Sequence, residues 1–443
     1  MNKQQSIFFI GIGGIGMSAL ARYYHRQGVA VYGYDKTETP LTNALEVEGI
    51  HVQFTTDIQQ LRTDTSLAVY TPAVPSDNPL FETIKNRGIR LIKRAELLGQ
   101  ISKKYKCIAI AGTHGKTSIT GLTAHILHQA NIPILAFIGG ITVNYNSNLI
   151  ADDQPKWMVV EADEYDRSFL FLNPDITLVS AMASDHMDIY GSKEAMVEAY
   201  NQFIGLTAAN GKVIVHQNLL DRCCGDASYG LHSGSSFFAR NITIQANKYH
   251  FQLVGPEISI KTYSRIPGKH NVENALAAMA IARYAGLSAT QIQQGIESYR
   301  GIKRRFEVIV ENNHHVFIDD YAHHPEEITA CIQAVKELYP DKKITGIFQP
   351  HLFSRTAEHA SAFAESLSAL DFCILMNIYP AREKPIPGIS SKQILQKITH
   401  ENKILLPDTD VVPFIAKMKP EILLTLGAGD IDRQIPALKN TIT

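Results

Sequence analysis

The sequence predicts an α/β protein of three domains, and three observations lead to that prediction. A strand, a glycine-rich turn, a helix and a second strand open the chain within residues 6–35. A strand, a glycine-bearing loop and a helix follow at residues 107–127, and a new alternation of strands and helices begins near Arg305. Such alternation is typical of parallel sheets covered by helices. We place the domain boundaries at residues 1–105, 106–305 and 306–443.

Composition limits the class of protein. The 443 residues include 42 Lys and Arg and 43 Asp and Glu, so a nucleic-acid partner or charge-driven membrane binding is not indicated. The five cysteines show no disulfide framework, as expected in a reducing compartment. Glycine and serine interrupt the apolar run at residues 7–21, and no run approaches the roughly 18 apolar residues of a membrane span. We expect a cytoplasmic protein without stable membrane association, as a monomer or weak homodimer.

The first domain begins with a Rossmann-like strand, turn and helix. The turn carries the pattern GxGxxG, and Asp35 ends the following strand. This pattern favours a dinucleotide, but the same turn can hold another pyrophosphate, such as that of a UDP-sugar, or be purely structural. A further strand at residues 66–71 is stopped by Pro72 and Pro75. The candidate residues of the turn are Gly11, Gly13, Gly14 and Gly16.

The second domain begins with a shortened phosphate-binding loop, which predicts a P-loop ATPase-like α/β domain. The backbone N–H groups of the loop and the helix dipole would face an anion. Lys116 can neutralise terminal phosphates, and the Thr117 hydroxyl can ligate Mg²⁺. The alternative is a helix start with a chance Gly-Lys-Thr. The loop comprises Gly112, Thr113, His114, Gly115, Lys116, Thr117 and Ser118.

Acidic residues follow the next strand of this domain, at residues 157–160. They are Glu161, Asp163, Glu164 and Asp166. A carboxylate at the carboxyl edge of the shared sheet suits a second Mg²⁺ ligand, and we favour Glu161. His186 follows the strand at residues 176–180 and is a further candidate for Mg²⁺ contact. The alternatives are a solvated acidic loop and a structural histidine.

Two polar groups close the second domain, after a strand at residues 212–215 and an antiparallel patch at 228–266. His270, Asn271 and Asn274 surround the start of a helix at residues 272–284, where an Asn amide can pair with adenine or cap the helix. Arg304 and Arg305 lie at the junction with the third domain, where they can clamp a phosphate or form an exposed salt bridge.

The third domain alternates strands and helices again and is expected to be Rossmann-like. Two polar segments follow its strands, and they suit a small-molecule site. Zinc is an alternative ligand for His323 and His324, but adjacent histidines cannot share one helix face and no Cys-X-X-Cys is present. Expected strands span residues 316–318, 343–348 and 372–376, and expected helices 326–338 and 357–367. The polar segments contain Asp319, Asp320, Tyr321, His323, His324, His351 and Arg355.

Taken in order, these segments resemble the Mur ligases, the ATP-dependent enzymes that form peptide bonds in bacterial cell-wall synthesis. The resemblance spans nearly the whole chain. The segments that carry it are GIGGIGMSALA, AVPSDNP, RAELL, GTHGKTS, EADEYD, DHMDIY, GKHNVENALAA, RRFE, DDYAHHPEE, FQPHLFSRT, YPAREKPIPG and GAGDI.

The resemblance implies a ligase of peptidoglycan synthesis that joins L-alanine to the lactyl carboxylate of UDP-N-acetylmuramate through an acyl phosphate, with ATP and Mg²⁺. It implies that the first glycine turn, with Asp35, binds the UDP-sugar. The phosphate loop, His270, Asn271, Asn274 and an arginine of the 304/305 pair would bind ATP, and Thr117, Glu161 and His186 would hold Mg²⁺. L-alanine would lie among Asp320, Tyr321, His323, His324, His351 and Arg355.

Three alternatives stay open. The nearest is the branch of the family that joins an intact tripeptide to UDP-N-acetylmuramate. An NAD(P)-dependent oxidoreductase fits the first glycine turn but leaves GTHGKT unexplained. A regulatory nucleotide switch needs none of the histidines of the third domain. A carbamylated-lysine metal bridge is not supported, because no lysine lies between Lys193 and Lys212.

Overall fold

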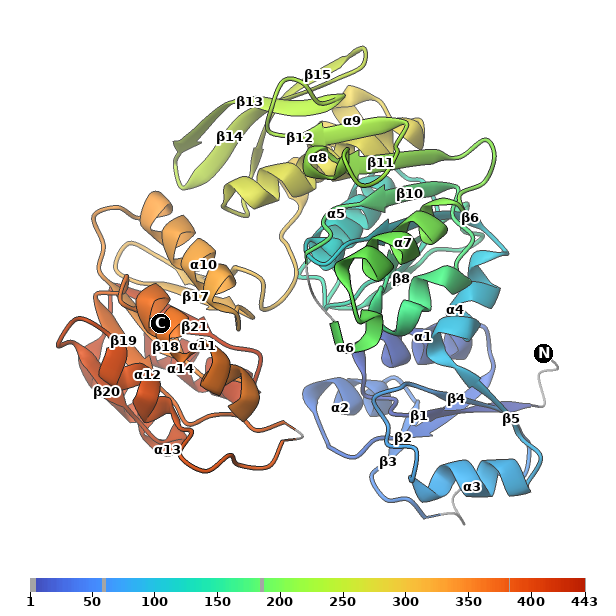
Figure 1. Cartoon of the computed structure of the whole chain (residues 1–443), viewed down its shortest axis with the longest axis horizontal. Coiled ribbons are helices and arrows are strands. Elements are labelled where there is room, and N and C mark those ends of the chain that lie inside the picture. Colours follow the sequence, from blue (N-terminus) through green and yellow to red (C-terminus); the bar gives the residue numbers. More distant parts are fainter. Residues whose placement is uncertain (1–4, 58–60, 184–186, 382, 443) are drawn as a thin grey trace. The chain divides into compact units, whose positions relative to one another are not determined.

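The computed structural model describes residues 5–57, 61–183, 187–381 and 383–442 (Figure 1). The chain divides into two compact units. The first unit comprises Met1–Asn241, Phe251–Thr262 and Val272–Tyr299, and the second comprises Ile242–His250, Tyr263–Asn271 and Arg300–Thr443. Three sheets organise the fold, so the predicted α/β class with three sheet-centred domains is confirmed. The domain boundaries given above stay a prediction.

The first sheet has five parallel strands in the order β3-β2-β1-β4-β5. This order places β1 at the centre, where the chain reverses direction across the sheet, as in Rossmann-like folds. The strands are β1 (Ser6–Ile10), β2 (Ala30–Tyr34), β3 (His51–Gln53), β4 (Thr65–Tyr70) and β5 (Arg90–Lys93). The helices are α1 (Ile15–Arg26), α2 (Pro40–Val47), α3 (Pro79–Asn86) and α4 (Arg94–Ser102).

The second sheet has ten strands in the order β15-β14-β13-β12-β11-β10-β6-β9-β7-β8. Its central strands are parallel, and β8 pairs with β7 in the antiparallel sense. The strands are β6 (Lys106–Ala111), β7 (Ile134–Phe137), β8 (Leu149–Ala151), β9 (Trp157–Ala162), β10 (Ile176–Val179), β11 (Lys212–His216), β12 (Ala227–Gly230), β13 (Phe237–Gln245), β14 (Lys248–Gly255) and β15 (Ile258–Ser264).

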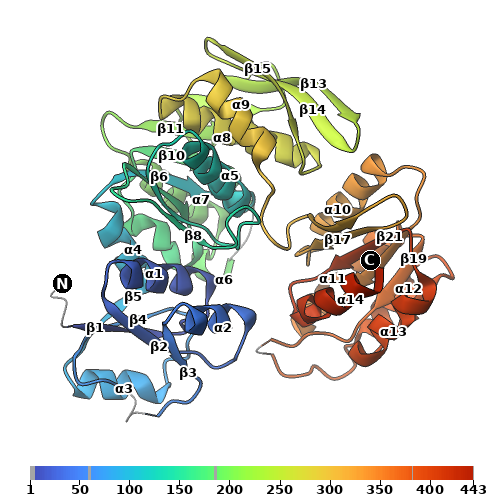
Figure 2. The ribbon, with the colours of Figure 1, turned by 180° about the vertical axis from the view of Figure 1, so that it is seen from behind.

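Along the chain, helices lie between and after the strands of the second sheet. Helix α5 packs against α9 (Figure 2). The helices are α5 (Lys116–Gln129), α6 (Met187–Tyr190), α7 (Lys193–Ile204), α8 (Lys269–Tyr284) and α9 (Ala289–Ser298), with the 3-10 helices η2 (Tyr165–Phe171) and η3 (Gln217–Leu219). Strand β12 pairs with β13 in parallel, so the stretch expected to be wholly antiparallel is not. Among the described residues, none of the helices combines the length and the apolar character that crossing a bilayer requires.

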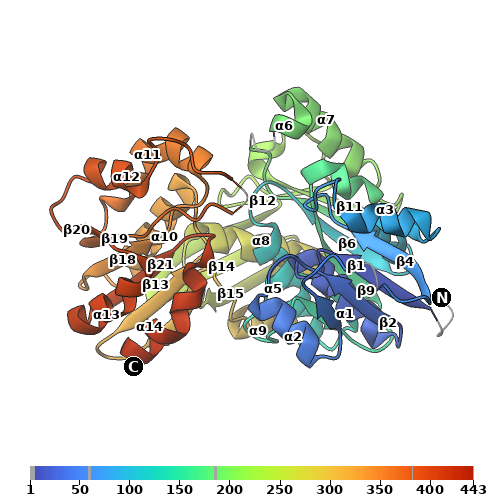
Figure 3. The ribbon, with the colours of Figure 1, turned by 90° about the horizontal axis from the view of Figure 1, so that it is seen from below.

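The third sheet has six strands in the order β16-β17-β21-β18-β19-β20, and only the β16–β17 pair is antiparallel. Helices α10 to α12 cover one face, and α13 and α14 the other (Figure 3). The strands are β16 (Glu307–Glu311), β17 (Val316–Asp320), β18 (Ile344–Phe348), β19 (Phe372–Leu375), β20 (Lys403–Leu405) and β21 (Ile422–Leu426). The helices are α10 (Pro325–Leu338), α11 (Phe353–Leu367), α12 (Ser391–Lys397), α13 (Asp408–Met418) and α14 (Ile435–Ile442), with η4 (Asp430–Gln434).

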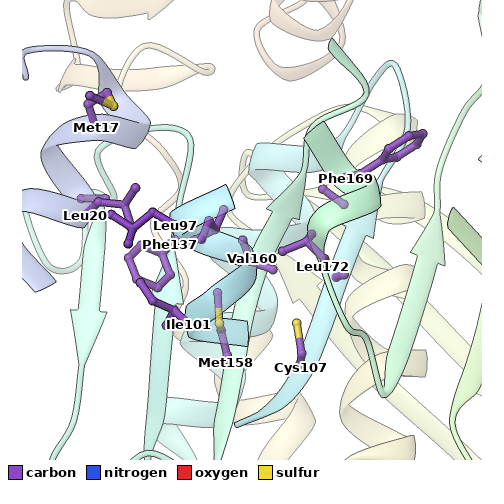
Figure 4. Packing of buried hydrophobic residues seen from close by; sticks show 14 of the residues in the cluster. Met17, Leu20, Leu97, Ile101, Cys107, Phe137, Met158, Val160, Phe169 and Leu172 are labelled. Atoms are coloured by element: carbon purple, nitrogen blue, oxygen red, sulfur yellow. The ribbon is translucent and has the colours of Figure 1, made fainter. Parts of the chain in front are cut away.

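The first two sheets share one hydrophobic core inside the first unit. Met17 and Leu20 of α1 lie in the same cluster as Phe137 of β7 and Leu97 of α4 (Figure 4). The buried side chain of Asn148 adds a polar tie, because its Nδ2 donates to Ile15 O at 2.6 Å and to Ser18 Oγ at 2.9 Å. A shared core and a satisfied buried amide hold the two sheets as one body.

Candidate functional site

Asp35 fixes the backbone of the first glycine turn. The N–H of Gly13 donates to Asp35 Oδ2 at 2.8 Å, and a Cβ on Gly13 would lie 2.7 Å from Thr42 Cγ2. Gly11 has a φ of 86°, a conformation that glycine adopts at little cost. The first helical hydrogen bond of α1 runs from Ser18 N to Gly14 O, so the N–H groups of Ile15, Gly16 and Met17 have no acceptor within the helix. The Asp35 carboxylate therefore shapes the turn that the sequence predicts to bind a diphosphate.

The phosphate loop connects β6 to α5 and is laid against the end of β10. Gly112 has a φ of 131°, and a Cβ there would lie 2.2 Å from Ser180 Oγ. Ser180 Oγ also hydrogen-bonds Ala111 O at 3.1 Å, while Thr113 N donates to Ala181 O at 3.1 Å. Sequence reasoning did not identify Ser180, because only the pairing of β10 with β6 brings it to the loop.

Lys116 is bound by a buried carboxylate. Its Nζ donates to Glu164 Oε1 at 2.9 Å, to Glu164 Oε2 at 2.8 Å and to Gly112 O at 2.6 Å. The Glu164 side chain is 2% exposed, whereas that of Lys116 is 17% exposed. The sequence shows four acids after β9 but does not indicate which one faces the lysine. The Lys116 ammonium group therefore stabilises the buried negative charge of Glu164.

Glu161 lies near the carboxyl end of β9, as predicted from the sequence. It pairs in register with Ile110 of β6, and its Oε1 accepts a hydrogen bond from Gly139 N at 2.6 Å. Thr117 is buried in the first turn of α5. His186, the third predicted metal ligand, lies outside the described residues. Among the residues that the structure describes, no group of three His, Cys, Asp or Glu side chains is arranged to hold a metal ion.

The predicted adenine-binding residues fall inside a helix, since α8 begins at Lys269. Asn274 is brought to the phosphate loop, because a Cβ on Gly115 would lie 3.1 Å from Asn274 Oδ1. Asn271 Nδ2 donates to Pro267 O at 2.6 Å and lies 3.0 Å from His270 Nε2. Asn271 is therefore within the first turn and is not the N-cap.

Arg304 is held inside the second unit. Its Nη2 donates to Gly427 O at 2.6 Å, and its Nε lies 3.4 Å from Asp319 Oδ2. Its Nη1 contacts Gly429 O at 3.3 Å and Asp432 Oδ2 at 3.4 Å. All three nitrogens of the guanidinium are thus engaged, while Arg305 is exposed. The phosphate contact expected of this arginine pair stays a prediction.

The two aspartates that end β17 have internal partners. Asp319 is fully buried, and burial raises its pKa to about 7, although Arg304 and Thr425 act in the opposite direction. Asp320 accepts from Phe306 N and Ala322 N, each at 2.7 Å, and burial raises its pKa to about 6. Asp320, a predicted amino-acid ligand, therefore shapes the turn after β17.

A cluster of aromatic and cationic side chains follows β17 and β18. The His351 ring stacks on Tyr379 with centroids 5.8 Å apart, and its centroid lies 6.2 Å from that of His323. His351 Nδ1 and Arg355 Nη1 are buried and have no hydrogen-bond partner among the described residues. A buried polar atom without a partner is costly, so these two atoms mark a candidate place for a polar ligand.

Of the other predicted residues in this cluster, one is exposed near His323 and one supports helix α10. Tyr321 is exposed, and its ring lies 5.3 Å from that of His323. His324 supports helix α10, because its N–H donates to Glu327 Oε2 at 3.2 Å and its ring packs on His359. Sequence reasoning did not identify Tyr379, although it lies within the segment YPAREKPIPG.

Family models match most of the chain. They are described as "Mur ligase family, catalytic domain" at residues 6–106, "Mur ligase middle domain" at 110–282 and "Mur ligase, glutamate ligase domain" at 304–430. The chain belongs to the Mur ligase family, whose members are ATP-dependent ligases. The family predicted from the ordered segments is therefore confirmed.

Full-length relatives carry a more specific name. UDP-N-acetylmuramate–L-alanine ligase of Christiangramia forsetii is 43% identical over 100% of this chain and 98% of its own. The protein of the same name from Porphyromonas gingivalis is 43% identical over 98% of each chain. The crystal structure of UDP-N-acetylmuramate-alanine ligase from Thermotoga maritima matches with a TM-score of 0.86 and 26% identity over 98% of both chains. A murein peptide ligase from Psychrobacter arcticus shares the fold, with a TM-score of 0.69.

The buried His351 predicts a specific pH dependence of stability. Burial, together with the charge of Arg355, lowers the pKa of His351 to about 4, compared with about 6.5 in an unfolded chain. Between these values the unfolded chain binds a proton that the folded protein does not. The stabilisation is therefore present above about pH 6.5 and is lost as the pH falls towards 4. His351→Gln should flatten the dependence of the urea midpoint on pH over this range.

The control for this measurement is His51→Gln, because the side chain of His51 is 67% exposed. This variant should retain the pH dependence of the parent protein. An unchanged pH dependence in His351→Gln would contradict the assignment of a buried, neutral imidazole.

Proposed function

We propose that this protein joins L-alanine to the lactyl carboxylate of UDP-N-acetylmuramate, using ATP, in peptidoglycan synthesis. The observation that carries the proposal is the bonded Lys116 of the phosphate loop, in a chain 43% identical over its full length to ligases of that name. We further propose that it works in the cytoplasm on these small-molecule substrates, without stable membrane association, as a monomer or weak homodimer.

The phosphate loop would bind the triphosphate of ATP. Lys116 Nζ contacts both oxygens of Glu164 and Gly112 O, and it would donate to a phosphate oxygen while it keeps the Glu164 carboxylate as its partner. The N–H groups at the start of α5 add positive potential. Asn274 lies beside this loop, and Arg305 would supply a further cation.

We propose that Mg²⁺ binds between the start of α5 and the end of β9. The Thr117 hydroxyl and the Glu161 carboxylate would supply the oxygen ligands that it prefers, and His186 would supply a nitrogen ligand. When bound, Mg²⁺ would polarise phosphoryl oxygens and neutralise their charge. The residues of the chain have their own tasks: Gly139 N orients Glu161, and Lys116 stabilises charge on the γ-phosphate.

The chemistry requires an activated carboxyl group, because a carboxylate does not release hydroxide to an amine at neutral pH. The lactyl carboxylate would attack the γ-phosphorus, ADP would leave, and an acyl phosphate would form. The amine of L-alanine would attack the acyl carbon, and phosphate would leave from the tetrahedral intermediate. The UDP group would be held at the turn that Asp35 shapes.

The free amino acid would bind at the cluster of the second unit. Arg355 Nη1 is buried without a partner among the described residues, and a guanidinium is suited to the carboxylate of L-alanine. His351 Nδ1, the second such atom, would donate to the same group or accept from the substrate. The His323 ring lies beside that of His351, and the Tyr321 ring lies beside that of His323.

Product analysis distinguishes this function from the tripeptide-joining alternative. The purified protein is given ATP, Mg²⁺ and UDP-N-acetylmuramate with either L-alanine or the tripeptide, and the product is weighed by mass spectrometry. We expect the mass of the L-alanine adduct and the release of one phosphate. Joining of the tripeptide alone would refute the proposed substrate, and nicotinamide turnover would refute the class of reaction.

Lys116→Ala should abolish acyl-phosphate formation, because the γ-phosphate would lose the lysine that is proposed to neutralise it. Binding of UDP-N-acetylmuramate should persist, and it can be measured by calorimetry alongside phosphate release. The same variant leaves Glu164 without its ion-pair partner, so Lys116→Ala/Glu164→Gln tests whether folding is the cause. Phosphate transfer that continues in a folded variant would refute the role of Lys116.

Arg355→Ala should raise the KM for L-alanine by about 30-fold or more, since losing one partner of a buried charge pair costs at least about 2 kcal/mol. The KM for ATP should change little. Arg433→Ala is the matched control, because Arg433 is an exposed arginine of the same unit and should leave both constants unchanged. An unchanged KM for L-alanine in Arg355→Ala would contradict the site.

A further inference from the structure

The residues Glu161–Asp166, here called the acidic segment, contact the N-terminal domain as well as the phosphate loop. Asp163 Oδ2 accepts from Arg94 Nη2 at 3.1 Å, and Asp166 Oδ2 lies 2.9 Å from Lys93 Nζ. Lys93 ends β5 and Arg94 begins α4, so both cations come from one junction. The segment is thus attached on one side to Lys116, through Glu164, and on the other side to this junction.

The guanidinium of Arg94 reaches the first glycine turn at the same time. A Cβ on Gly16 would lie 3.0 Å from Arg94 Nη1 and 3.3 Å from its Cδ. Nη1 therefore lies against the backbone at the start of α1, while Nη2 binds Asp163. One side chain connects the turn that binds the UDP-sugar with the segment that holds Lys116.

The acidic segment leads into a tightly constrained part of the chain. Asp166 and Arg167 have φ values of 54° and 52°, a conformation that costs non-glycine residues free energy. A Cβ on Gly99 of α4 would lie 2.4 Å from Phe171 O, so α4 and η2 are in close contact. Helix α4 thus contacts the acidic segment at its first residue, Arg94, and the 3-10 helix that follows that segment at Gly99.

We propose that Arg94 is a positioning residue that couples the binding of UDP-N-acetylmuramate to the binding of ATP; this inference rests on the function proposed above. A diphosphate at the first glycine turn accepts a charge-assisted hydrogen bond from Nη1. The guanidinium is then fixed between the diphosphate and Asp163, which orders the acidic segment and with it Glu164 and Lys116. Because this ordering is needed for both ligands, the first ligand to bind lowers its cost for the second.

The test is the affinity of the non-hydrolysable analogue AMP-PNP with Mg²⁺, measured by calorimetry with and without saturating UDP-N-acetylmuramate. We expect the sugar nucleotide to tighten AMP-PNP binding by about fivefold or more, and AMP-PNP to tighten sugar-nucleotide binding by the same factor. Arg94→Ala should reduce this factor to near one. Asp163→Asn should do the same from the other end of the contact, and the double variant should lose no more than either single variant.

The variant Arg94→Lys tests whether the coupling depends on the shape of the guanidinium or only on its positive charge. The lysine keeps the positive charge, but it cannot present two nitrogens to two partners in a fixed plane, so coupling should fall while sugar-nucleotide affinity is largely kept. Arg90→Ala is the matched control. It removes a cation from β5 that forms an exposed ion pair with Glu96 at 3.4 Å, and coupling should persist.

Three results would count against the proposed role of Arg94. Full coupling in Arg94→Ala, equal loss of coupling in Arg90→Ala, or independent binding of the two ligands to the parent protein would overturn the role of Arg94. Independent binding would leave the proposed function standing. Failure of the parent protein to bind either ligand would instead overturn the proposed function itself.

Discussion

The ion pair between Lys116 and Glu164 is the interaction on which the nucleotide site depends. Glu164 is almost fully buried, and a buried carboxylate without a partner would cost several kcal/mol. Lys116 provides that partner and also bonds Gly112 O, so the pair fixes the lysine and the loop together. A phosphate in the loop would have to bind beside Lys116 while Glu164 keeps its partner, because the buried carboxylate depends on that ion pair.

The carboxyl ends of parallel strands gather the rest of each site. In the first unit, the register of β6 with β9 and β10 brings together the phosphate loop, Glu161 and Ser180. In the second unit, β17 and β18 both pair with β21, so the segments that follow β17 and β18 meet at one edge. The backbone thus assembles polar residues that are far apart in the sequence, which is why parallel sheets commonly bear sites at this edge.

Two arginines of the second unit show how contacts separate support from function. Every nitrogen of the Arg304 guanidinium has a partner, and these partners join β17 to the segment after β21. Arg355 instead keeps a buried nitrogen without a partner among the described residues. The same side chain type is a structural tie in one place and a candidate ligand in the other, and neighbouring polar groups make the difference.

The α/β class, the two glycine-bearing loops and the Mur ligase family could be predicted from the sequence, because these depend on local patterns and on the order of segments along the chain. It also located the cluster of His351 and Arg355, since both follow one strand. Four features could be seen only in the folded chain. Glu164 faces Lys116, Ser180 supports the phosphate loop, Asp320 and Arg304 have partners in the framework, and Arg94 lies between two loops. Such pairings depend on strand register and on side-chain packing across many tens of residues, which local sequence patterns do not specify.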